Sequence, residues 1–143
     1  MTKVRLLTIA CGLGLVFAFT FGETRSATAA ADPARFTAIE TAIDSTIGAF
    51  TAASGDLGSK SESFVNAFTQ AKQDVVTAAD DDAQSDKKHA SSALKRAIHK
   101  VNGVSFKLRN LHARKTIPSE TRLMLLGLVK PIRSDLVQLR KDL

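Results

Sequence analysis

Residues 86–113 read DKKHASSALKRAIHKVNGVSFKLRNLHA, and this stretch decides the fold. Its apolar residues recur at intervals of four and three, which places them on one face of an α-helix. This seam consists of Ala90, Leu94, Ala97, Val101, Val104, Leu108 and Leu111. Asn102-Gly103 could form a turn, but the seam crosses both residues without a change of phase. A helical glycine costs only about 1 kcal/mol relative to alanine, so we expect one helix over 86–113.

Three further segments, 33–53, 60–79 and 118–141, have the same periodicity. Their seams are Phe36, Ile39, Ile43, Ile47 and Phe50; Phe64, Phe68, Ala71, Val75 and Ala78; and Leu125, Val129, Ile132, Leu136, Leu139 and Leu143. No stretch alternates with period two, so we expect no strand. Four helices of about 20–28 residues with short connections predict an all-α fold, an up-down-up-down four-helix bundle.

Helix starts are indicated by capping residues. Asp32 before Pro33 suits the start of the first helix, and Pro118 suits the first turn of the fourth. Ser59 and Glu62 have the spacing of a capping box for the second helix.

Helix ends and breaks are indicated by polar residues and proline. We expect 54–56 to end the first helix, and 80–82, three aspartates, to make a polar break after the second. Pro131 removes the hydrogen bond to the carbonyl of Gly127, so we expect a kink in the fourth helix.

The first 30 residues have the three-part pattern of a secretory signal peptide. Two bases lie among the first five residues, 6–22 carry no charge and are mostly apolar, and 26–31 are small. We expect a signal peptide over 1–30, cleaved before Ala30 or Asp32, a bundle domain over 31–143, and export to the periplasm or the extracellular space. An uncleaved membrane anchor is the alternative.

Cys11, the one cysteine, lies inside this apolar stretch. Too few apolar residues precede it for a lipoprotein signal, so we expect it to be removed with the signal peptide. The mature chain would then have no disulfide, thiolate metal site or thiol nucleophile.

Charge divides the chain into two halves. Residues 32–86 carry ten acids and three bases, a net charge of −7, whereas 87–143 carry fourteen bases and three acids, a net charge of +11. The favoured interpretation is attraction between the halves, which selects one pairing of the helices. The alternative is a cationic face for an anionic partner.

A cationic face would lie on the third and fourth helices. The third seam directs Asn102, Asn110 and several other residues away from the core. The candidate contacts for an anionic partner are Lys88, Lys95, His99, Phe106, Lys107 and Lys130. The partner would be an anionic polymer, an anionic lipid or an acidic protein; the signal for nucleic acid is weak, because envelope polysaccharide or lipid is more accessible to an exported chain.

The fourth helix has a second apolar ridge, Leu123, Leu126 and Val137, beside Lys130. We expect it to widen the buried stripe. A homodimer contact is the alternative.

Cofactor sites are not indicated. His89 and His99 point to the flank and outward on one helix, and His112 points near the core. The alternative is a carrier of a small apolar ligand beside Gly127 and Pro131, or of haem between His112 and Met124. The acidic run 80–86 lacks the glycine and the glutamate of a calcium loop.

Motifs of catalysis are also missing from the sequence, so we expect a binding or structural protein and not an enzyme. The layout is similar to that of b562-type and c′-type cytochromes and plant invertase inhibitors. Because their haem-binding residues and cysteines are missing, the resemblance stops at the layout.

Overall fold

The computed structural model describes residues 31–143. The elements are α1 Pro33–Ala52, α2 Ser54–Leu57, η1 Gly58–Lys60, α3 Ser61–Ala83, α4 Lys87–Arg109, α5 Leu111–Thr116 and α6 Ser119–Asp142. No strand occurs within 31–143, and the predicted all-α class is confirmed. The predicted signal peptide lies outside the described residues.

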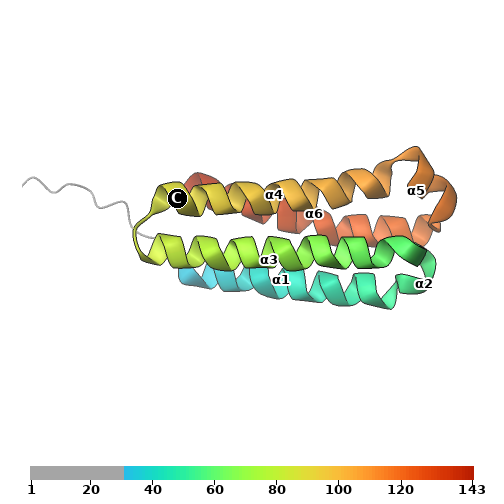
Figure 1. The fold of residues 1–143 in the computed structure, drawn as a ribbon, viewed down its shortest axis with the longest axis horizontal. Coiled ribbons are helices and arrows are strands. Elements are labelled where there is room, and N and C mark those ends of the chain that lie inside the picture. The colour runs from blue at the N-terminus through green and yellow to red at the C-terminus, as the bar shows by residue number, and fades with distance from the viewer. Residues whose placement is uncertain (1–30) are drawn as a thin grey trace, which may run out of the picture.

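Four long helices lie side by side along the long axis of the molecule (Figure 1). Helix α1 packs on α3 and α6, and α4 packs on the same two helices. The short elements α2 and α5 lie at one end, and the α3–α4 connection lies at the other (Figure 1). Consecutive long helices therefore run in opposite directions, as expected for an up-down-up-down arrangement.

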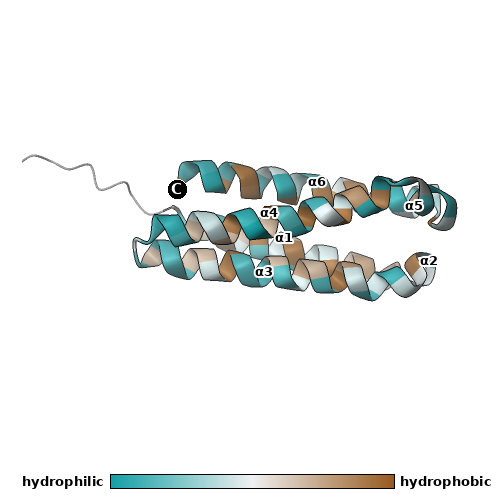
Figure 2. Ribbon diagram, turned by 45° about the horizontal axis from the view of Figure 1, so that its top comes forward, coloured by the Kyte–Doolittle hydropathy of each residue, from teal (hydrophilic) through white to brown (hydrophobic). Residues whose placement is uncertain are grey.

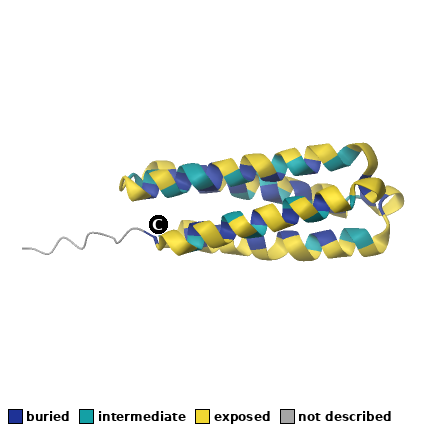
Figure 3. Ribbon diagram, turned by 90° about the horizontal axis from the view of Figure 1, so that it is seen from below, coloured by how far each residue is buried: buried dark blue, intermediate teal, exposed yellow. Residues whose placement is uncertain are grey.

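The predicted seams form the core. Buried residues follow one stripe along each long helix, and exposed residues cover the outside (Figure 3). Hydropathy has the same periodicity, with apolar and polar segments alternating along each helix (Figure 2). In α1, Thr46 is buried where Ile47 was expected, and Ile47 is only partly buried. Every other seam residue whose side chain is described is buried except Leu143, which packs against the core in part.

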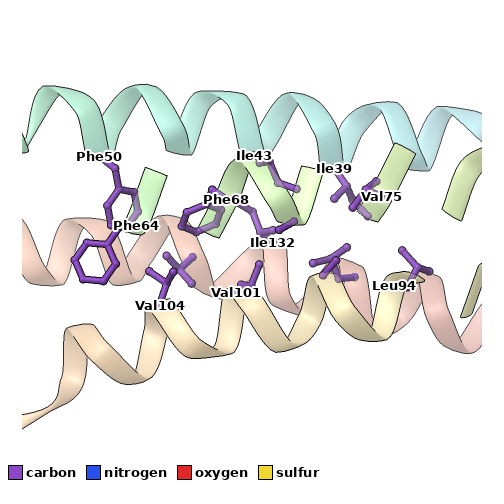
Figure 4. Packing of buried hydrophobic residues seen from close by; sticks show 14 of the residues in the cluster. Ile39, Ile43, Phe50, Phe64, Phe68, Val75, Leu94, Val101, Val104 and Ile132 are labelled. Atoms are coloured by element: carbon purple, nitrogen blue, oxygen red, sulfur yellow. The ribbon is translucent and has the colours of Figure 1, made fainter. Parts of the chain in front are cut away.

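Three phenylalanines fill one end of this core. The ring of Phe50 on α1 lies 5.5 Å from the ring of Phe64 and 5.3 Å from that of Phe68, both on α3 (Figure 4). Tilted rings at this separation contribute about 0.5–1.5 kcal/mol beyond their buried area. The cluster fixes how α1 and α3 pair.

The expected end of the first helix is confirmed, since α1 stops at Ala52 with Ala53 as its cap, just before residues 54–56. The chain continues into α2 and η1, because Leu57 is buried at 4% exposure over the end of the core. Gly58 then reverses the chain at φ +56°. The predicted capping box does not form, since Ser59 lies inside η1 and Lys60 takes the cap position without a side-chain hydrogen bond.

The polar break expected at 80–82 is wrong. Helix α3 runs through these aspartates to Ala83, and Asp82 is buried. The chain turns after the helix instead, where Ser85 has φ +63°.

The third predicted helix is interrupted near its end. Helix α4 stops at Arg109, and Asn110 caps α5 by accepting a 2.8 Å hydrogen bond from the backbone N–H of Ala113. Asn102-Gly103 is helical, as predicted.

Helix α6 begins one residue later than expected, with Pro118 as its cap, and continues across Pro131 to Asp142. Its second ridge is only partly buried. Leu126 packs against the core, but Leu123 is 62% exposed, so the prediction of a wider buried stripe fails at this residue.

Candidate functional site: a basic groove between α4 and α6

Helix α4 carries seven bases and no acid. They are Lys87, Lys88, Lys95, Arg96, Lys100, Lys107 and Arg109. Because the side chains leave a helix in different directions, these charges divide between the neighbour α3 and the neighbour α6.

On the α3 side, the acidic half neutralises part of this charge. Asp74 is buried at 8% exposure and accepts hydrogen bonds from Arg96 Nε at 2.9 Å and Lys100 Nζ at 2.5 Å. The interpretation that opposite charges pair the helices therefore holds at this contact.

Lys107 also lies on the α3 side. Its Nζ atom is 3.5 Å from the hydroxyl of Ser63 on α3, and it lines a hollow with Lys60 and Phe64. Lys107 therefore lines a different hollow from the one lined by Phe106 and Lys130.

On the α6 side, the surface is hollowed. We call this hollow the basic groove; its volume is about 350 Å³, and it is lined by Asn102, Ser105, Phe106, Arg109, Val129, Lys130 and Arg133. Three cationic residues thus line the same hollow as Phe106, an aromatic residue that is 73% exposed. No carboxylate lines the groove within the described residues.

Contacts between α4 and α6 fix the groove. Nε of Arg133 donates a 2.5 Å hydrogen bond to Oδ1 of Asn102, and Nε of Arg140 donates one of 3.2 Å to the hydroxyl of Ser91. These contacts set the register of the two helices, in which Phe106 of α4 and Lys130 of α6 line one hollow.

The carboxylates of the second half of α6 lie toward α1. Asp142 pairs with Arg35 at 2.6 Å, and this hydrogen bond holds the pKa of Asp142 below its ordinary value of 3.8. Asp135 lines a separate hollow with Arg35 and Ile39. Neither Asp135 nor Asp142 therefore lines the basic groove.

The structure unites two of the six predicted contact residues, Phe106 and Lys130. Lys88, Lys95 and His99 are exposed on α4 but do not line the groove. Arg109 and Arg133 were missed, because their convergence depends on the register between α4 and α6. Arg109 follows Phe106 by three residues, so helical spacing places both on one face of α4. This spacing is a sequence signal that could have identified Arg109.

The histidines do not converge. His89 is exposed and hydrogen bonds to Asp86, whose pKa this contact lowers. His112, expected near the core, is exposed instead, because α5 breaks from the line of α4. Within residues 31–143 no group of three or more His, Cys, Asp or Glu side chains could hold a metal ion.

The region proposed for an apolar ligand lies on the surface. Gly127 and Pro131 are exposed, and a Cβ on Gly127 would meet no atom within 4 Å. Met124, a partner considered for haem, is 52% exposed. Of the described helices, none is long and apolar enough to span a membrane.

Comparisons with protein-family models, with curated proteins and with solved structures found no significant match to this chain.

Proposed function

We propose that this chain is an exported, non-catalytic binding protein that holds an acidic polysaccharide in the basic groove. The observation that carries the proposal is the exposed ring of Phe106 among Arg109, Lys130 and Arg133. The pattern of residues 1–30 supports export after cleavage of a signal peptide.

The chemistry of the groove fits an acidic sugar. A pyranose ring has an apolar C–H face that can pack on Phe106, as apolar groups pack on exposed aromatic rings. Arginine binds carboxylate with two parallel hydrogen bonds, and lysine supplies a compact positive charge. A repeating unit with one carboxylate and one apolar face would use both features.

The charge asymmetry supports the same proposal. Asp74 pairs with Arg96 and Lys100, whereas the cations that line the groove, Arg109, Lys130 and Arg133, belong to no ion pair among the described residues. A groove of one sign attracts a polyanion before contact is made.

The test is equilibrium binding of the exported protein to polygalacturonate, with neutral dextran as the control polymer and phosphatidylglycerol vesicles as the lipid control. We expect polygalacturonate to bind roughly tenfold more weakly when NaCl rises from 20 to 200 mM, because salt screens the groove. Phe106→Ala should weaken binding at both salt concentrations. Binding that does not change with salt, or preferential binding to the vesicles or to neutral dextran, would contradict the proposal.

A further inference from the structure

Asp82 is a buried carboxylate in the last turn of α3. Its exposure is 2%, and its Oδ2 atom accepts a 2.7 Å hydrogen bond from the backbone nitrogen of Ala31. Its Oδ1 atom is buried without a hydrogen-bond partner among the described residues. A buried carboxylate is costly unless it is paired and hydrogen-bonded.

The end of α3 concentrates negative charge around this group. Asp80 and Asp81 precede it, and the last turn of α3 contains no base. The C-terminal end of a helix also carries a partial negative charge, which favours a nearby cation. No ion pair within residues 31–143 includes Asp82. A positive charge is therefore needed at the backbone atom that donates a hydrogen bond to Oδ2 of Asp82.

That atom is the nitrogen of Ala31. We infer that the mature chain begins at Ala31 and that its terminal ammonium group forms an ion pair with Asp82. The inference rests on the export part of the proposed function. Hydrolysis of the Ala30–Ala31 peptide bond by an export peptidase adds one water, leaving a carboxylate on Ala30 and an ammonium on Ala31. Thr28 and Ala30 are small residues at the positions that such a peptidase reads.

The new terminus fits its surroundings. Ala31 is 8% exposed and lines a hollow of about 180 Å³ with Phe36, Ala79 and Asp82. An ammonium group has three N–H donors where an amide has one, so it can also donate a hydrogen bond to Oδ1 of Asp82. Cleavage would thereby tie the start of α1 to the end of α3.

The direct test is the N-terminal sequence of the chain expressed with its own residues 1–30 in a bacterium and recovered from the exported fraction. We expect the sequence to start at Ala31. A start at Ala30, at Asp32 or at another nearby residue would overturn the inference and leave export intact. A product that is not exported and retains residues 1–30 would contradict both the inference and the export part of the proposed function.

The ion pair is tested by thermal unfolding of chains that start at Ala31 or at Ala29. Both are expected to fold, because the described core is supplied by residues 31–143. The Ala31 chain should melt about 2–6 °C higher. Asp82→Asn should abolish this difference, and Asp80→Asn, an exposed control, should preserve it. Equal melting of the two chains, or a difference that persists in Asp82→Asn, would overturn the pairing.

Discussion

Nε of Arg96 on α4 lies 2.9 Å from a carboxylate oxygen of Asp74 on α3, across the contact between the basic and acidic halves of the chain. Lys100 reaches the other oxygen of the same carboxylate. Arg96 and Lys100 thus pair α4 with α3, whereas we propose that the cations lining the basic groove bind a ligand.

Asp74→Asn should lower the free energy of unfolding by about 1–3 kcal/mol, because it removes the charge that two cations share at a nearly buried site. Urea denaturation measures the loss. The matched control is Asp44→Asn, which breaks the pair with Lys72 at a side chain that is 53% exposed. That exposed pair should be worth at most about 0.5 kcal/mol. If the two substitutions lowered the free energy of unfolding equally, the claim that the nearly buried Asp74 contributes more than an exposed ion pair would be contradicted.

Phe50 and Phe106 should differ in their effect on stability, because one is buried in the core and the other is exposed. Phe50→Ala should cost about 3–5 kcal/mol, because the ring is fully buried and contacts two other rings. Phe106→Ala should change the free energy of unfolding by less than about 0.5 kcal/mol, since Phe106 is 73% exposed. Thermal and urea unfolding measure both. A large loss of stability in Phe106→Ala would mean that this ring serves the fold and not a ligand.

Alanine substitutions at two glycines should change the stability of the protein in opposite directions. Gly58 has φ +56°, so Gly58→Ala should destabilise the protein by about 1–2 kcal/mol. Gly103 lies inside α4, and a Cβ there would meet no atom within 4 Å. Gly103→Ala should therefore stabilise the protein by about 0.5–1 kcal/mol. Denaturant titration of the two variants measures both changes in the free energy of unfolding. An increase in Gly58→Ala would contradict the positive φ angle of Gly58.

The Arg35–Asp142 pair should make stability depend on pH. Because the folded state holds the pKa of Asp142 below 3.8, its contribution is present above that value and is lost as the pH falls through the folded-state pKa. Arg35→Gln should thus lower the melting temperature at pH 7, and the difference from wild type should vanish at strongly acidic pH. A difference that grows with acidification would have the wrong sign.

The seams were predictable because burial follows helical periodicity. Phe64, Phe68 and Val75 could be placed in the core from their spacing alone. The break at Asn110 was not predictable in this way, because the seam continues in phase to Leu111 and only the cap to Ala113 ends α4.

Other differences between the predictions and the structure depend on contacts between residues that are far apart in the sequence. Asp82 is buried because a backbone nitrogen 51 residues earlier in the chain meets it, which no local pattern encodes. Arg133 joins Phe106 in the basic groove only through the register of α4 against α6, which the hydrogen bond to Asn102 reveals. Sequence alone could name Phe106 and Lys130, but not the groove that unites them.

The most direct test of the central claim is a pair of equal charge reversals. Lys130→Glu alters the basic groove, whereas Lys107→Glu makes the same change of charge on the α3 side of α4. At 20 mM NaCl, we predict that Lys130→Glu weakens binding to polygalacturonate at least about tenfold, a loss of ~1.4 kcal/mol, and that Lys107→Glu weakens it far less. Equal weakening by both would show that binding depends on net charge, and would contradict a site between α4 and α6.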